Sequence, residues 1–271
     1  MRFLDMMRLE PHGPDTFVGV GPAYPWGGLY GGQIVAQGLR AAGLTVEPQF
    51  RVHSLHAYFV RRGDASEPIR FEVERVRNGR SFVTRSLEAR QSTGAILTMT
   101  ASFQVDEDAP EIQRATMPEV SGPDAFPAGG WSEVFDRRFV VANEDGCARA
   151  WVRVNEDLGD DPLVQACALA YASDDLPTDA LVALHPDRRD APDDDASGDD
   201  EEEGGNQFMA ASLDHAIWFH RPSRADEWQL QDFTAQGMRG SRGVSVGHFF
   251  SADGVHVATV AQEVLLRTRR R

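Results

Sequence analysis

The chain has 271 residues, of which 41% are apolar and 25% charged, and it carries a formal net charge of −15. That much apolar material is enough for one large core or two modest ones, so the composition excludes global disorder. The strongly negative charge repels polyphosphate strands and therefore argues against nucleic-acid binding.

Hydropathy and cysteine content set two further limits. No apolar stretch approaches the roughly 18 residues that cross a bilayer, and the first residues, Met1 to Arg8, contain no apolar signal core. We therefore expect no membrane insertion and a cytoplasmic location. The two cysteines, Cys147 and Cys167, are too few for a disulfide framework, a four-cysteine zinc site or an iron–sulfur cluster, so no metal site is predicted.

The first predicted element is a helix from Gly31 to Ala42, which is rich in small and unbranched residues and is closed by Gly43. Apolar or small side chains surround it on nearly all sides. We therefore expect other elements to enclose this helix, as a curved antiparallel sheet would, rather than expose it on the surface.

A block of strands follows the first helix. Residues 69–73 and 95–104 alternate apolar and polar side chains, which is typical of strands with one buried face. The pair Asn78-Gly79 is the clearest hairpin signal of the chain, so these strands predict an antiparallel meander. The block ends in an irregular stretch with four prolines and a double glycine, and we place a linker there, at residues 108–130.

The second half repeats this order. A helix is predicted from Pro162 to Ala172, closed by Ser173-Asp174. The segment 187–207 then holds ten acidic residues and almost no apolar ones, so burial cannot offset its ordering entropy and we expect a mobile loop. A second block of strands follows, with Asp253-Gly254 as its hairpin signal.

A weak internal repeat connects the two blocks. His56 to Arg62 lies over His215 to Arg221 at an offset of 159, and Gly94 to Gln104 lies over Gly254 to Val264 at an offset of 160. We therefore predict an α+β protein in which one long helix is paired with one sheet, twice over. The predicted units are residues 1–107 and residues 131–271, the second including the acidic loop 187–207.

Several segments also resemble a known family, the type II acyl-CoA thioesterases, which are double hotdog proteins with two antiparallel sheets that each wrap a long helix. The resemblance runs from about Tyr24 to Leu266, in the same order as in the family. The segments that carry it are LYGGQIVAQ (29–37), VHSLHAYF (52–59), RNGRSF (77–82), MTASFQ (99–104) and LDHAIWFHRP (213–222).

The resemblance implies three catalytic residues in the second unit. The family hydrolyses acyl-CoA by water attack with an aspartate, a hydroxyl residue and a glutamine, and these fall on Asp174, Ser212 and Gln262. Ser212 stands where the family usually has threonine, and it lacks the methyl group that restricts the threonine rotamer. Gln262 lies over Ser102 in the repeat, so the first unit lacks the amide and only one of the two units can hold this trio.

These residue types suit water attack. Water is a poor nucleophile at neutral pH and needs a base and neighbours that direct it. Asp174 supplies the acceptor at a helix C-terminus, where the negative end of the macrodipole raises the basicity of a carboxylate. Ser212 and Gln262 can both donate and accept, so they can hold the water or the developing oxyanion, and no cofactor is required.

Each of the three also has a purely structural reading. Asp174 can be a polar helix end, followed by Asp175 in an exposed loop, Gln262 a polar residue on a solvated strand face, and Ser212 a strand-end hydroxyl. His56 and His215 match in the repeat, which favours shared structural roles over a nucleophile's base or a metal ligand. With no G-x-S-x-G elbow and no recognisable setting around the cysteines, covalent catalysis is disfavoured.

Substrate contacts are predicted at two kinds of position. Gly31-Gly32 opens the first helix, where free backbone N–H groups can face a carbonyl or phosphate, although a double glycine there is more often a steric requirement. Arg80 in the Asn-Gly hairpin and Arg242 are basic groups that could meet the phosphates of coenzyme A.

The leading hypothesis is therefore an enzyme that hydrolyses fatty acyl-CoA to free fatty acid and coenzyme A without a covalent intermediate. A non-catalytic acyl-CoA or lipid-binding double hotdog protein is the alternative. An enoyl-CoA hydratase on the same fold is less well supported, because that chemistry typically uses an Asp/His pair in a hydratase motif that is absent here. The family resemblance also implies a homodimer or higher homo-oligomer.

Overall fold

The computed structural model describes residues 1–141, 146–188 and 207–269. The predicted acidic loop 187–207 lies, apart from Asp187, Arg188 and Gln207, outside the described residues. None of the described helices is long and apolar enough to cross a membrane. Among the described residues, no three His, Cys, Asp or Glu side chains come together in a group that could hold a metal ion.

The first half of the chain contains two helices and six strands, followed by a long connection with a short 3-10 turn. In chain order the elements are α1 (Phe3–Met6), β1 (Glu10–Pro11), β2 (Thr16–Gly19), α2 (Gly31–Leu44), β3 (Phe50–Phe59), β4 (Ile69–Asn78), β5 (Phe82–Gln91), β6 (Gly94–Val105) and η1 (Pro123–Ala125).

The second half adds further strands around two helices. Its elements are β7 (Phe135–Val141), β8 (Cys147–Val154), α3 (Pro162–Ala172), α4 (Pro177–Leu184), β9 (Phe208–Ser212), β10 (Asp214–Phe219), β11 (Gln229–Arg239), β12 (Arg242–Ser251) and β13 (His256–Thr268). The predicted helix bounds agree with α2 to within two residues and with α3 at both ends.

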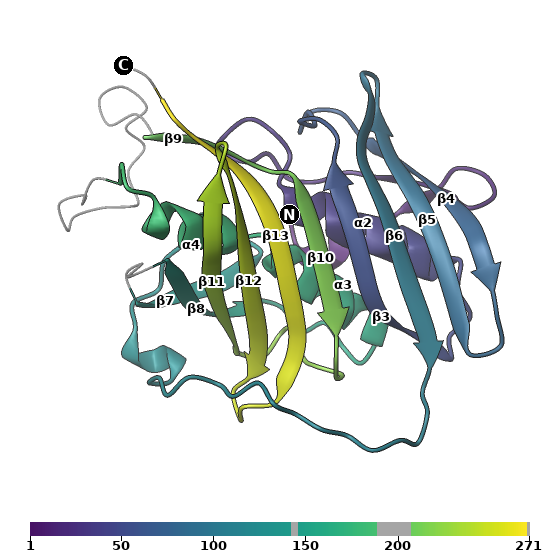
Figure 1. Cartoon of the computed structure of the whole chain (residues 1–271). Helices are drawn as coiled ribbons and strands as arrows, with labels where there is room; N and C mark the ends of the chain where they lie inside the picture. The colour runs from purple at the N-terminus through teal and green to yellow at the C-terminus, as the bar shows by residue number, and fades with distance from the viewer. Residues whose placement is uncertain (142–145, 189–206, 270–271) are drawn as a thin grey trace.

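All thirteen described strands belong to one antiparallel sheet. Twelve of them follow the order β1-β2-β4-β5-β6-β3-β10-β13-β12-β11-β8-β7, and the thirteenth, β9, pairs with β13 beside this path. The two halves meet where β3 and β10 pair, with Tyr58 opposite Asp214 and Ser54 opposite Trp218. The sheet is therefore continuous across the middle of the molecule (Figure 1). The predicted α+β class and antiparallel meanders are confirmed.

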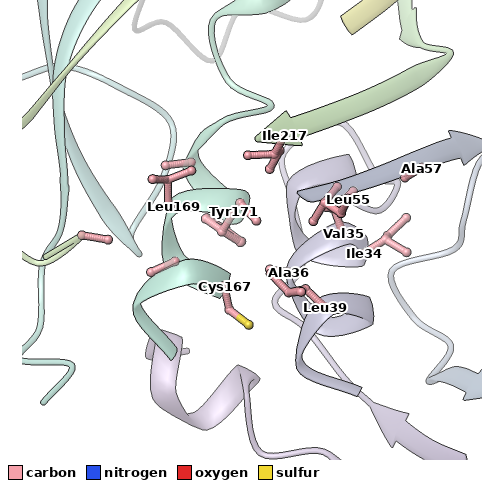
Figure 2. Packing of buried hydrophobic residues seen from close by; sticks show 14 of the residues in the cluster. Ile34, Val35, Ala36, Leu39, Leu55, Ala57, Cys167, Leu169, Tyr171 and Ile217 are labelled. Carbon is pink, nitrogen blue, oxygen red and sulfur yellow. The ribbon is translucent and has the colours of Figure 1, made fainter. Parts of the chain in front are cut away.

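The central part of the core lies between the sheet and the helices. Helix α2 packs against β3 to β6 and against α3. Ile34 and Leu39 of α2 and Cys167 and Tyr171 of α3 are buried there, as Figure 2 shows. Small residues let the two helices approach closely, because a Cβ atom added at Gly32 would lie 2.2 Å from the Tyr171 carbonyl oxygen.

Helix α4 was not predicted. It packs on β8, β11, β12 and β13, so the second half has two helices where the sequence predicted one. Pro177 occupies the first helical position, where its missing N–H is not needed. Eight residues are too few for a clear helical period, so the sequence pattern does not reveal this helix.

The repeat between the halves has a different register from the one predicted. At the equivalent point in each half, two consecutive N–H groups share one carbonyl acceptor: Val60 and Arg61 share Ile96, and His220 and Arg221 share Val257. β10 therefore matches β3 at an offset of 160, and β13 matches β6 at 161. Gln262 consequently corresponds to the buried Ala101 rather than to Ser102.

This shift corrects the prediction that His56 and His215 occupy equivalent positions. His56 is exposed and contacts Asp214, whereas His215 is completely buried. A slip of one residue along a strand moves a side chain to the opposite face of the sheet, so the two histidines lie in different environments.

Candidate active site

Asp174 is positioned by the end of α3. Asp161 caps the N-terminus of this helix by accepting the Leu163 N–H, and Ser173 is its C-cap. The chain then turns inward, which leaves Asp174 only 8% exposed. The predicted location of a carboxylate at the negative end of a helix is therefore present in the structure.

The residue after Asp174 fixes this turn. Asp175 accepts hydrogen bonds from Arg137 Nη1 at 2.6 Å and from Trp131 Nε1 at 2.9 Å, and its side chain is 2% exposed. The alternative in which Asp175 continues an exposed loop is therefore wrong. The charged donor of Arg137 and the neutral donor of Trp131 thus hold Asp175 in place, and Asp175 in turn fixes the backbone at Asp174.

Ser212 and Gln262 reach Asp174 from the sheet. Ser212 is the last residue of β9 and pairs with Val264 on β13, while Gln262 lies two residues earlier on β13. Side chains two apart on a strand share a face, so Gln262 and Val264 both point inward. Gln262 is 1% exposed, which excludes the reading of a polar residue on a solvated strand face.

The three side chains form a continuous chain of hydrogen bonds. Gln262 Nε2 donates to Ser212 Oγ at 2.8 Å, and Ser212 Oγ donates to Asp174 Oδ1 at 2.9 Å. The second carboxylate oxygen, Oδ2, accepts the backbone N–H of Gly32 at 3.0 Å. Residues far apart in the sequence thus converge on one carboxylate, and the N-terminus of α2 contributes from the first half.

The surroundings make Asp174 unusually basic. The pKa of Asp174 is raised to about 6: burial and, to a smaller extent, the charge of Asp175 raise it, and they outweigh the hydrogen bonds from Ser212, Gln262 and the Gly32 N–H, which lower it. The carboxyl group therefore remains mostly ionised at neutral pH while holding a proton more readily than an exposed aspartate. These are the properties that a general base requires.

Aromatic rings close the site beside the α2 N-terminus. Tyr30, the N-cap of α2, donates its hydroxyl to the Tyr171 carbonyl at 2.9 Å. Its ring centroid lies 4.8 Å from that of Trp131 and 5.0 Å from that of Tyr171. This apolar wall limits the access of bulk water, in agreement with burial as the main cause of the raised Asp174 pKa.

The predicted substrate-binding residues have different outcomes. Gly32 uses its N–H on Asp174, and a Cβ added at Gly31 would lie 2.5 Å from Asp174 Oδ2, so both glycines permit close approach to the carboxylate. Arg80 is exposed in the turn between β4 and β5. Arg242, at the start of β12, pairs with Glu263 of β13 at 3.0 Å. Glu263 follows Gln262 in the strand and therefore points to the opposite face of the sheet. The structure does not bring these two arginines to the trio.

Sequence reasoning missed the role of His215 in this arrangement. Its Nδ1 contacts Gln262 Oε1, and its Nε2 lies 2.7 Å from Ser173 Oγ. The repeat predicts a structural role for His215, but only the correct strand register places the imidazole on the inward face. The available signal was the alternation of His215 with the buried Ile217.

Known proteins match this chain over nearly its whole length. The family "Acyl-CoA thioesterase N-terminal domain" matches residues 21–104, and "Acyl-CoA thioesterase C-terminal domain" matches residues 107–266. Acyl-CoA thioesterase 2 of Haemophilus influenzae is 33% identical, covering 97% of this chain and 96% of the relative. Acyl-coenzyme A thioesterase 8 of Homo sapiens is 31% identical, covering 97% of this chain and 88% of its own length.

Solved structures are similar over the same range. The acyl-CoA thioesterase II TesB2 from Mycobacterium marinum has a TM-score of 0.82 at 35% identity, covering 98% of this chain and 97% of that one. A protein with a hot dog fold from Alicyclobacillus acidocaldarius has a TM-score of 0.79 at 21% identity, covering 99% and 98%. The second likeness concerns the fold alone.

Proposed function

The chain belongs to the type II acyl-CoA thioesterase family, and we propose that Asp174, Ser212 and Gln262 carry out its reaction by directing a water molecule at the thioester carbonyl. The enzyme hydrolyses acyl-CoA to a free acid and coenzyme A. The single observation that carries the proposed mechanism is the convergence of the three side chains in one hydrogen-bonded chain.

Asp174 acts as the general base. Its carboxylate takes a proton from the water, whose oxygen forms a bond to the carbonyl carbon and produces a tetrahedral oxyanion. When this intermediate collapses, the carbon–sulfur bond breaks and the departing sulfur receives the proton. The products are a carboxylic acid and a thiol, and no bond to the protein forms at any stage.

Ser212 and Gln262 orient the reaction. With their donors directed along the chain toward Asp174, they hold the carboxylate in one rotamer and keep its basic lone pairs facing the water. The positive end of the α2 dipole, at Gly31 and Gly32, lies on the same side and favours negative charge at the developing oxyanion.

The remaining predictions are part of this proposal. The fold is a double hotdog, in which residues 108–130 link repeats 1–107 and 131–271, and the separate matches of N-terminal and C-terminal domains support that division. Arg80 and Arg242 are exposed candidates for the coenzyme A phosphates, and their replacement by alanine would raise KM without lowering kcat. The exposed Tyr58 and Trp218, on the outer face of β3 and β10, favour a homo-oligomer.

The test is a thiol-release assay with short, medium and long acyl-CoAs. We expect Asp174→Asn and Gln262→Ala to lower kcat about a hundredfold or more, as is usual for the loss of a positioned base. Ser212→Ala should lose activity, while Ser212→Thr, which keeps the hydroxyl, should retain it. Asp106→Asn, in the exposed connection after β6, is the matched control.

Two results would contradict the proposal in different ways. Equal turnover of the wild type and of both Asp174→Asn and Gln262→Ala would remove the site assignment. Saturable binding of a non-hydrolysable acyl-CoA analogue, with no thiol release by the wild type, would favour a binding protein instead.

A further inference from the structure

His215 lies beside the proposed catalytic residues but is not one of them. It is completely buried on β10. Its Nδ1 contacts Gln262 Oε1 and its Nε2 lies 2.7 Å from Ser173 Oγ. Because Ser173 immediately precedes Asp174, the imidazole links the end of α3 to the amide of Gln262.

The direction of each hydrogen bond follows from the ionised carboxylate. Asp174 can only accept, so the Ser212 hydroxyl proton points to Oδ1 and the Ser212 oxygen accepts from Gln262 Nε2. The amide oxygen of Gln262 then faces His215 and needs a donor. Nδ1 must therefore carry the imidazole proton, which leaves Nε2 as an acceptor. Nε2 lies 2.7 Å from Ser173 Oγ, whose hydroxyl also reaches the Ala170 carbonyl oxygen at 3.0 Å.

The imidazole is neutral at physiological pH. The pKa of His215 is lowered to about 4: burial and, to a smaller extent, His56 lower it, and they outweigh the hydrogen bond with Gln262 and the charge of Asp214, which raise it. A neutral histidine has one donor and one acceptor, and this site uses both. The ring can therefore take up a further proton only at Nε2, where it would lose the acceptor that faces Ser173.

We propose that His215 is a positioning residue, whose Nδ1–H holds the Gln262 carbonyl and thereby keeps the amide N–H directed at Ser212. This inference rests on the proposed catalytic role of Asp174, Ser212 and Gln262. Gln262 is 1% exposed, so bulk water cannot replace the lost donor. Without it the amide is free to rotate and to present its oxygen, an acceptor, to the oxygen of Ser212.

Two replacements separate the two contacts of the ring. Asparagine places an N–H near the position of Nδ1, so His215→Asn keeps the donor for Gln262 and loses the contact with Ser173. Glutamine reaches the position of Nε2, so His215→Gln keeps a partner for Ser173 and loses the donor for Gln262. His215→Leu removes both, and His220→Asn, just beyond the end of β10, is the matched control.

The expected result is a change in kcat with little change in KM. His215→Leu and His215→Gln should lower kcat about tenfold or more, as the loss of a supporting hydrogen bond to a catalytic group does. His215→Asn should restore most of it, and His220→Asn should match the wild type. The acidic limb of the pH profile should move to higher pH in the leucine and glutamine variants, because weaker hydrogen bonding raises the pKa of a carboxylate.

Equal losses in His215→Asn and His215→Gln, with unchanged pH profiles, would show that the ring serves packing alone and would overturn the proposal. Wild-type kcat in all three variants would do the same. If the variants do not fold, ¹⁵N NMR of histidine in the wild-type enzyme gives an independent test. A neutral Nδ1–H tautomer at neutral pH supports the proposal, and an Nε2–H tautomer contradicts it.

Asp174→Asn distinguishes this inference from the mechanism on which it rests. If Asp174→Asn retains wild-type turnover, the proposed mechanism fails and the His215 inference fails with it. If Asp174→Asn is inactive while all His215 variants are fully active, the mechanism stands and only the positioning role is lost.

Discussion

At the scale of single residues, the proposed role of Asp174 as general base ties the pH dependence of the reaction to the ionisation of this carboxyl group. The base must be deprotonated, and burial raises the pKa of Asp174 to about 6. We therefore expect kcat/KM to be constant above about pH 7 and to fall about tenfold per pH unit well below pH 6. A thiol reagent that works in acid would measure this profile, and a flat profile down to about pH 4.5 would contradict it.

The same ionisation predicts a cost in stability. The pKa of Asp174 rises from 3.8 in the unfolded chain to about 6 in the folded one, so the folded state binds more protons between these values and loses stability as pH increases through them. We expect Asp174→Asn, which does not ionise, to gain stability relative to the wild type by about 2–3 kcal/mol between about pH 4 and pH 7.

Urea unfolding of both proteins at the two pH values measures this difference. The comparison of one pH with the other cancels the constant effect of replacing an oxygen by an amide nitrogen. A stability difference that does not change with pH would contradict the prediction. Such a gain is typical of a catalytic group held in a destabilising environment.

At the scale of elements, the contact of α2 with α3 controls the site. A Cβ added at Gly32 would lie 2.2 Å from the Tyr171 carbonyl oxygen. This oxygen belongs to the backbone of α3 and cannot move aside as a flexible side chain could, so the two helices would have to separate. We expect Gly32→Ala to lower the free energy of unfolding by about 2 kcal/mol or more. It should also lower kcat, because its N–H would move away from Asp174.

Gly38→Ala is the matched control in the same helix. Its nearest neighbour would be the flexible end of Met99, at 3.2 Å, so the better helix propensity of alanine should offset or exceed the strain. Thermal unfolding together with the thiol-release assay measures both variants. Equal stability of the two would contradict the role given to Gly32.

The elements also show how far sequence alone could go. The high content of small residues in α2 and α3 was enough to predict the bounds of both helices. The pairs Asn78-Gly79 and Asp253-Gly254 were enough to predict the two hairpins. The identities of Asp174, Ser212 and Gln262 came from resemblance, while their convergence needed the structure. The register of the repeat was not predicted, because Ala216 and Trp218 on the other face of β10 are apolar as well. The alternation of His215 with Ile217 alone therefore does not fix which histidine is buried.

At the scale of the whole molecule, the two halves are unequal. Arg85 on β5 pairs with Ala101, as Ser245 on β12 pairs with Gln262, so the buried Arg85 stands in the place of Ser245. Its Nε donates to the hydroxyl of Thr45, the C-cap of α2, at 2.7 Å. The first half therefore has a guanidinium beside Ala101, at the position where the second half has the small hydroxyl of Ser245 beside Gln262.

This difference predicts that Arg85 acts on stability and not on catalysis. Arg85→Met keeps the length of the stem but leaves buried acceptors without a donor, so we expect a loss of about 3 kcal/mol in the free energy of unfolding and an unchanged kcat for the folded enzyme. Arg90→Met, whose exposed side chain pairs with Glu88 on the same sheet, should lose less than about 1 kcal/mol. Urea unfolding and titrated enzyme assays measure both, and a large fall in kcat for Arg85→Met would contradict the prediction.

The backbone N–H of Gly32 crosses from the first half to bind the carboxylate of the second. A protein engineer who grafts one half onto a different relative would therefore transfer only part of the proposed reaction centre. The opening turn of α2, the residues that follow α3 and the seam between β3 and β10 must be transplanted together, as one inseparable module.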